Sequence, residues 1–219
     1  MTKPIALVGT MLAALGVIAS LFLSWVWFAN PNTLPEQIAR LLANQIVQEA
    51  LRRYPELPAT FGITTSTNVG QTPTVDQFFV DPSAKKLAIL AQRHRSLSAW
   101  SLWFEAPRIG NFLWFALLFT FLAALGSGMC ALIQLLNQRA TIPLPAWFGC
   151  SGISLLAFIL VISQIPSIDT LGLQNNFGIA LVCTMTDSQL GSGPWWTLGA
   201  LLLLVGGNLL VAALPNHSS

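Results

Sequence analysis

The stretch IALVGTMLAALGVIASLFLSWVWF, residues 5–28, contains no charged side chain and is long enough to cross a membrane as one helix. About 20 helical residues cover the roughly 30 Å of hydrocarbon in a bilayer. Only Lys3 supplies charge before the stretch, and tryptophans stand where a cleavable signal peptide carries small residues. We therefore predict that residues 1–28 form a transmembrane helix kept as an uncleaved signal anchor, in preference to a cleaved signal peptide.

The rest of the chain has the composition of a membrane protein. Of its 219 residues, 54% are hydrophobic and 8% are charged, whereas an ordinary soluble domain carries about 25% charged residues. Three more segments are long, apolar and free of Asp, Glu, Lys, Arg and His: 109–136, 145–165 and 194–214. The net charge of +2 and the lack of a basic stripe argue against nucleic-acid binding. We predict an all-α membrane protein built on a bundle of four transmembrane helices.

The connections between these segments differ greatly in length. Residues 137–144 form a short link, so the second and third helices are predicted to be an antiparallel pair. Residues 29–108 and 166–193 form two larger loops on one side, and they contain all eight acidic residues. Lys3 and Arg139 lie in short segments and mark the inner side. We therefore predict an extracytoplasmic α+β cap made from both loops, with both termini, including the tail 215–219, in the cytoplasm and the chain in the plasma membrane.

Residue patterns within the loops predict the elements of the cap. Residues 34–54 have apolar positions at helical spacing, which predicts an amphipathic helix. We expect this helix to pack on the cap, the alternative being a helix that lies in the headgroup layer. Residues 61–80 and 177–185 have the composition of strands, and we expect the two to pair in one short sheet. Residues 84–103 predict a second short helix.

Aromatic residues concentrate where the cap should meet the bundle. Tryptophan favours membrane interfaces because its ring is apolar and its N–H needs a polar partner. We interpret one set as an interfacial anchor, the alternative being a docking surface for another membrane protein. The set comprises Trp25, Trp27, Trp100, Trp103, Phe104, Arg108, Trp114, Trp195 and Trp196.

Small residues predict the close helix contacts inside the bilayer. Glycine and alanine at four-residue spacing let membrane helices approach each other. The predicted packing residues are Gly9, Ala13, Ala124, Gly128, Gly206 and Gly207. The pattern leaves open whether these residues contact helices of this chain or of a partner.

The chain resembles the claudin-like superfamily of four-helix membrane proteins. The resemblance is carried by residues 6–28, by SLWF at 101–104, by Arg108 before the second helix, and by WTLGALLLLVGG at 196–207. It implies lateral assembly or an accessory role, with strands from both loops in one outer sheet. The family's first loop carries two cysteines after its Leu-Trp pair, and loop one here has none. This departure argues against a paracellular barrier built like a claudin's.

Motifs for catalysis are absent from the sequence. The three cysteines have no CxxC spacing; Cys130 and Cys150 fall at similar depth, and we expect both to be free thiols. Cys183 has no cysteine partner in the cap, and His94 has no second histidine nearby. We expect no catalytic residue, no cofactor and no metal; an enzyme with Glu105 and His94 as an acid–base pair ranks third among the functions considered.

Two classes of function remain. The first is a non-enzymatic scaffold or accessory subunit that contacts the lipid bilayer and either other membrane proteins or further copies of itself. The second is a component of a transporter or channel, or a lipid-binding membrane protein. Few polar residues in the spans could line a path for a solute: Ser127, Ser151, Ser154 and Asn208.

Overall fold

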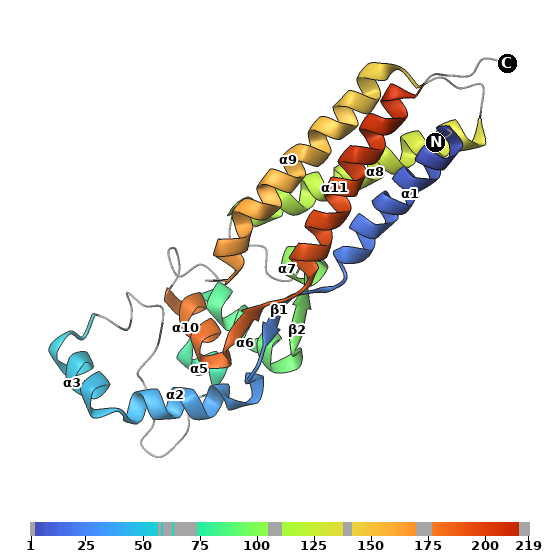
Figure 1. Cartoon of the computed structure of the whole chain (residues 1–219). Helices are drawn as coiled ribbons and strands as arrows, with labels where there is room; N and C mark the ends of the chain where they lie inside the picture. The colour runs from blue at the N-terminus through green and yellow to red at the C-terminus, as the bar shows by residue number, and fades with distance from the viewer. Residues whose placement is uncertain are drawn as a thin grey trace.

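The computed structural model describes residues 3–56, 58, 63, 74–104, 111–137, 142–169 and 177–214. It has two parts, a bundle of long helices and a smaller cap at one end of it (Figure 1). The first helix begins and the last helix ends at the far end of the bundle, away from the cap. The segments between the first two long helices and between the last two therefore meet at the same end, as the sequence predicts.

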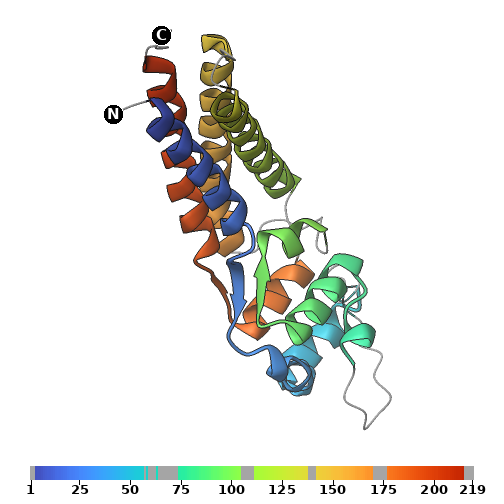
Figure 2. The same ribbon diagram turned by 90° about the vertical axis from the view of Figure 1, so that its right-hand side faces the viewer.

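Four long helices form the bundle: α1 (Lys3–Ser20), α8 (Asn111–Leu136), α9 (Leu144–Asp169) and α11 (Gly193–Ala213). All four are long and apolar enough to cross a membrane by length and composition, which is the pattern of a multi-pass membrane protein. α1 packs against α8 and α11, and α9 packs against the same two helices. The helices thus form a ring in which α8 and α11 lie diagonally opposite each other. Figure 2 shows the bundle and cap from the side.

A three-stranded antiparallel sheet connects the cap to the bundle. The strand order is β2 (Ser96–Ser98), β1 (Ser24–Phe28), β3 (Ser188–Leu190), so β1 is central. Val26 of β1 lies opposite Leu97 on one side and Leu190 on the other. Each outer strand comes from one of the two loops, and each pairs with the segment that follows α1.

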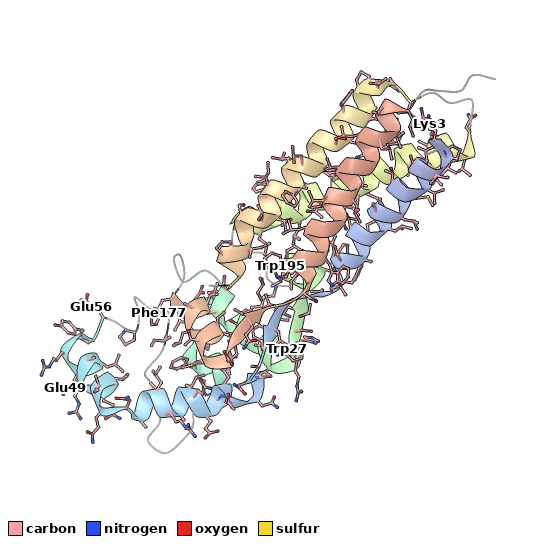
Figure 3. All side chains as sticks on the ribbon, in the orientation of Figure 1. Lys3, Trp27, Glu49, Glu56, Phe177 and Trp195 are labelled. Carbon is pink, nitrogen blue, oxygen red and sulfur yellow. The ribbon has the colours of Figure 1, made fainter. Side chains whose placement is uncertain are left out.

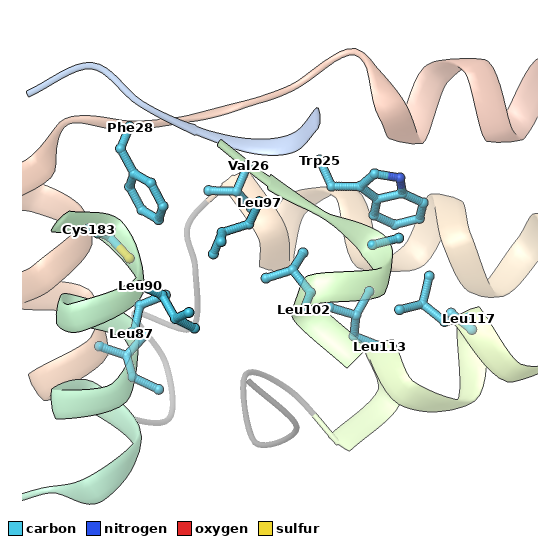
Figure 4. Close-up of a cluster of buried hydrophobic side chains, with 14 of the residues drawn as sticks. Trp25, Val26, Phe28, Leu87, Leu90, Leu97, Leu102, Leu113, Leu117 and Cys183 are labelled. Carbon is cyan, nitrogen blue, oxygen red and sulfur yellow. The ribbon is translucent and has the colours of Figure 1, made fainter. Parts of the chain in front are cut away.

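Short helices complete the cap. They are the 3₁₀ turn η1 (Pro31–Thr33), α2 (Leu34–Ala43), α3 (Gln45–Arg53), α5 (Val75–Phe78), α6 (Pro82–Arg93), α7 (Ala99–Phe104) and α10 (Phe177–Thr186). The apolar faces of α2, α5, α6, α7 and α10 join one core that continues from the cap into the bundle. Figure 4 shows where Leu102, Leu113 and Leu117 of α7 and α8 meet side chains of the sheet.

The first long helix is shorter than predicted. It ends at Ser20, and the residues up to Phe28 form β1 instead of continuing the helix. Backbone N–H groups of residues 21–23 bond to carbonyls three residues earlier, which marks the tightened last turn of a helix. The aromatic and β-branched residues of SWVWF favour a strand, and pairing on both edges satisfies the backbone.

Several predictions for the loops are wrong in detail. Residues 177–185 lie in helix α10, not in a strand, and the loop-two strand is Ser188–Leu190. Of residues 61–80, the described part holds an Ile63–Phe79 bridge and the short helix α5. Residues 84–103 contain most of α6, then β2 and most of α7. Most side chains of residues 177–186 are covered. A short apolar run that is buried on all sides has the same sequence pattern as a helix or as a strand, which is why the prediction failed here.

Two further boundaries also differ from prediction. The amphipathic segment 34–54 is two helices, separated at Asn44, whose extended backbone ends α2 and caps α3. Pro166 lies inside α9 and does not end it. α8, which precedes the short link 137–144, ends at Leu136 as predicted.

Candidate functional site

The predicted aromatic set divides into buried and exposed members. Trp25 is fully buried, with 0% exposure, so it is a core residue and the prediction that it anchors the interface is wrong. Trp27, two residues along the same strand, is 44% exposed on the cap, and Figure 3 places it beside the sheet while Trp195 lies at the base of α11. Regular strand alternation would place Trp25 and Trp27 on the same face, so it does not explain the difference. The pairing of β1 with β2 is irregular between Ser24 and Val26, and a bulge of this kind redirects a side chain.

Trp25 is enclosed by the start of α11. Its indole N–H donates to the carbonyl of Ser20 at 3.2 Å, which gives a partner to one carbonyl at the end of α1. A Cβ on Gly193 would overlap the indole ring, and a Cβ on Gly191 would overlap the Ser24 carbonyl. These two glycines therefore let the second loop close against β1, where the Gly191 N–H also donates to the Trp25 carbonyl at 2.9 Å.

Exposed aromatic residues surround the junction of bundle and cap. Trp100 stacks on Phe22 with ring centroids 5.8 Å apart and contacts Phe104 at 4.7 Å. Trp114 contacts Phe115 in a T-shaped arrangement at the start of α8. Trp195 and Trp196 are exposed in the first turn of α11. The Trp103 side chain and Arg108 lie outside the described residues.

The predicted packing residues also divide. Ala13 and Ala124 are buried, a Cβ on Gly128 would lie 3.3 Å from the Ala14 Cβ, and one on Gly207 would press on the Thr10 hydroxyl. These four therefore lie at helix contacts within the chain. Gly9 and Gly206 have open space around the position of a Cβ, so neither makes a close helix contact within the described part of the chain, and a contact with a partner stays a prediction. Both face outward on neighbouring helices.

Helix α3 has an apolar face that the described residues cover only in part. Ile46, Val47, Ala50, Leu51 and Tyr54 share one side of the helix at helical spacing. Yet α3 has no buried residue, and Ile46 is 79% exposed. The expectation that the whole amphipathic segment packs on the cap is therefore wrong for its second half.

The preceding helix, α2, behaves differently. Its apolar side chains Leu34 and Ile38 are fully buried in the cap core. Both helices carry an exposed ion pair at i, i+4, Arg40 to Glu36 and Arg53 to Glu49, and such pairs stabilise a helix only slightly. α3 begins where the Asn44 side chain accepts the Ile46 N–H at 2.9 Å, a strong N-cap. α3 therefore starts at a defined residue, while no side chain of its apolar face is fully buried.

The two helices lie at the end of the cap far from the bundle. Figure 3 places Glu49 of α3 at this outer extreme, beyond Phe177 at the start of α10. If the four long helices cross a membrane, the apolar face of α3 is held away from that membrane. The headgroup-layer alternative therefore loses its geometric basis.

A cluster of polar side chains lies inside the bundle, and we call it the polar core: Ser127, Gln134, Trp147, Ser151 and Asn208. The Asn208 amide of α11 donates to the Ser127 hydroxyl of α8 at 2.9 Å. Because α8 and α11 are diagonal in the ring, this hydrogen bond crosses the centre of the bundle.

Four atoms of the polar core are buried without a partner among the described residues. They are Gln134 Oε1, Trp147 Nε1, Ser151 Oγ and Asn208 Oδ1. An unpaired buried polar atom costs about 1–3 kcal/mol, so four together are a large cost for a protein. Ser127, Ser151 and Asn208 were expected as polar lining, whereas Gln134 and Trp147 were not. Helical spacing could have identified both residues. Gln134 follows Ser127 by seven residues and Trp147 precedes Ser151 by four, so each lies on the same helix face as an expected polar residue.

The cysteines are free thiols in the described structure. The Cys130 and Cys150 side chains are hydrogen-bond neighbours across α8 and α9, in agreement with their predicted depth. Cys183 is buried in the cap, and burial raises the pKa of its thiol to about 12, opposed by a hydrogen bond with Ser188. The part of the chain that is described holds no group of three His, Cys, Asp or Glu residues able to bind a metal.

The chain was compared with known proteins at three levels. No protein-family model matches it, no curated protein matches it, and no solved structure matches it.

Proposed function

We propose that this chain is a non-enzymatic multi-pass membrane protein that acts as a scaffold or accessory subunit. In this proposal α3 binds another protein, and the exposed aromatic residues at the bundle–cap junction contribute lateral contacts. The observation that carries the proposal is α3 itself: an amphipathic helix without one buried residue, at the end of the cap far from the bundle. Further parts of the proposal are a location in the plasma membrane with cytoplasmic termini.

The physical reason is the cost of leaving the apolar face of α3 in water. Each apolar side chain that becomes buried gains roughly 25 cal/mol per Å² removed from water. A nine-residue helix is too short to be stable alone on its propensity, so a partner that covers its apolar face also stabilises the helix. Helix-in-groove binding uses anchors at i, i+3, i+4 and i+7, and Val47, Ala50 and Leu51 of α3 have the first three of these spacings.

The occupant we propose is a protein with an apolar groove. α3 carries two arginines and one glutamate, and one of the arginines is paired with that glutamate. This small basic excess is too weak to attract an anionic lipid surface strongly. The resemblance to claudin-like proteins is compatible with an accessory role and stays a prediction, as does the absence of enzymatic activity.

Matched variants in the first turn of α3 test the proposal. Ile46→Glu and Gln45→Glu add the same charge at adjacent positions, but only the first lies on the apolar face. After purification of the full chain in mild detergent from its own cells, native mass analysis should show a stoichiometric partner. We expect Ile46→Glu to lose that partner and Gln45→Glu to keep it.

Photocrosslinking in intact cells gives the second readout. A benzophenone side chain at position 46 should crosslink to that same partner, whereas one at Arg52, on the opposite side of α3, should not. Equal recovery of the partner with both glutamate variants, or crosslinks from position 46 to lipid alone, would refute the docking role of α3.

The second candidate function is a component of a transporter or channel, or a lipid-binding membrane protein. The polar core favours this alternative, because unpartnered polar atoms inside membrane helices often line solute paths. Solute flux through proteoliposomes of the purified chain, abolished by Asn208→Leu, would favour it over the scaffold.

A further inference from the structure

We propose that the polar core is a water-binding site inside the four-helix bundle. This inference goes beyond the proposed function and does not depend on it. Four buried polar atoms on three helices, Gln134 Oε1, Trp147 Nε1, Ser151 Oγ and Asn208 Oδ1, have no partner among the described residues. Buried waters in proteins occupy sites of this kind, where they bond to polar groups that the chain itself leaves unsatisfied.

Contacts between helices bring these residues into neighbouring layers. Asn208 and Ser127 are hydrogen bonded across the bundle. Ser151 lies at a similar level, because a Cβ on Gly126 would meet the Cys150 sulfur at 3.7 Å.

The remaining two residues lie toward the chain ends. Trp147 is one turn before Ser151 and packs in one cluster with Ala131 and Val211. Gln134 lies on the same helix as Ala131, three residues further along. The polar core therefore continues from the Asn208–Ser127 pair toward the end of the bundle opposite the cap.

The hydrogen-bonding character of the atoms selects the ligand. An indole N–H can only donate, amide oxygens can only accept, and a hydroxyl does both. Water can accept from Trp147 and donate to Gln134 or Asn208, so one kind of ligand satisfies the whole mixed set.

Charge and size exclude other occupants. The bundle helices contain no acidic or basic side chain within residues 4–20, 111–136, 144–168 and 193–213, so these segments supply no charge to balance that of an ion. Every orphaned atom is inaccessible from outside, which suits a molecule as small as water and not an organic solute. The site we infer is therefore neutral and closed.

Trp147 provides the test because its indole N–H reports directly on its neighbour. The full chain, labelled with ¹⁵N-tryptophan in nanodiscs, should give up to eight indole signals, one for each tryptophan. Trp147→Phe and Trp25→Phe assign the two signals of interest. Trp25 is the matched control, since its indole is equally buried but donates to the Ser20 carbonyl at 3.2 Å.

We expect a nuclear Overhauser cross-relaxation peak between water and the Trp147 indole proton, and no such peak for Trp25. The sign of the peak separates direct cross-relaxation with a bound water from chemical exchange of the indole proton. We expect Ser151→Ala to weaken the Trp147 peak at least twofold while the other indole signals keep their positions. A Trp147 indole proton as silent toward water as that of Trp25 would overturn the proposal. A full-strength water peak in Ser151→Ala would overturn the assignment of Ser151 to the site.

Discussion

Replacing Trp25 and Trp27 in turn measures how differently two tryptophans of one strand act. Trp25 is 0% exposed and Trp27 is 44% exposed, although both belong to the five-residue strand β1. Trp25→Ala should destabilise the cap strongly, because it removes the largest side chain from the place where β1, α8 and α11 meet. Trp27→Ala should have a small effect, because much of its ring already contacts solvent or lipid.

Burial and hydrogen bonding set the magnitude. Truncating a buried tryptophan to alanine costs about 3–5 kcal/mol, and the Ser20 carbonyl also loses its indole donor. We expect a loss of about 4 kcal/mol for Trp25→Ala. For the half-covered Trp27 side chain the transfer term is about 1 kcal/mol. Trp25→Phe keeps most of the ring and loses the N–H, so its cost should be about 1–1.5 kcal/mol.

Pulse proteolysis in urea of the full chain in detergent micelles measures these differences. Trypsin cuts when the cap opens, at Lys85, Lys86 and Arg93 of α6 among other sites. With a urea m-value of about 2 kcal/mol/M, the Trp25→Ala midpoint should fall by about 2 M relative to wild type and the Trp27→Ala midpoint by about 0.5 M. Equal midpoints for the two alanine variants would refute the assignment of Trp25 to the core and restore the interpretation of both as surface anchors.

Two other positions give sharp expectations. Burial raises the pKa of the Cys183 thiol from 9.0 to about 12, so maleimide should leave it unmodified at pH 8 until the cap unfolds. Between pH 9 and 12 the unfolded chain loses the thiol proton while the folded chain keeps it, so stability should fall with rising pH and fall less in Cys183→Ala; equal slopes would contradict the burial. Gly193→Ala places a methyl group against the Trp25 ring and should lower the same proteolysis midpoint by more than 1 M, whereas Gly199→Ala, with open space around its Cβ position, should leave it unchanged; matching midpoints would show that the ring moves aside at no cost.

The number of long helices and the position of the cap could be read from the sequence. The four apolar segments are predicted to be helices because each is uncharged and long enough to cross a bilayer. The chain has too few polar residues to cover so much apolar surface in water. The placement of both loops at one end follows from an even number of crossings with a short link between the middle pair. The ends of α8 and α11 are also close to what local residue chemistry predicts.

Candidate sites were harder to predict because they depend on burial. The composition of residues 34–54 showed an amphipathic segment, but not that Leu34 and Ile38 would be covered while Ile46 would remain exposed. Gly9 and Gly206 were predicted alongside Gly128 and Gly207 as small packing residues, yet only the second pair lies at contacts within the chain. A spacing pattern defines a face of a helix, and only the neighbouring helix decides whether that face is covered.

The sequence by itself determined the class of architecture, because hydrophobicity and the lack of charge are properties of each segment taken alone. Tertiary structure alone decided that residues 24–28 leave the helix to become the central strand, since that conformation requires β2 and β3, which lie far along the chain, to supply hydrogen bonds on both edges. It also decided that Asn208 meets Ser127 across the bundle. Both features are contacts between residues distant in sequence, and the energy of such a contact exists only when packing has brought the two partners together.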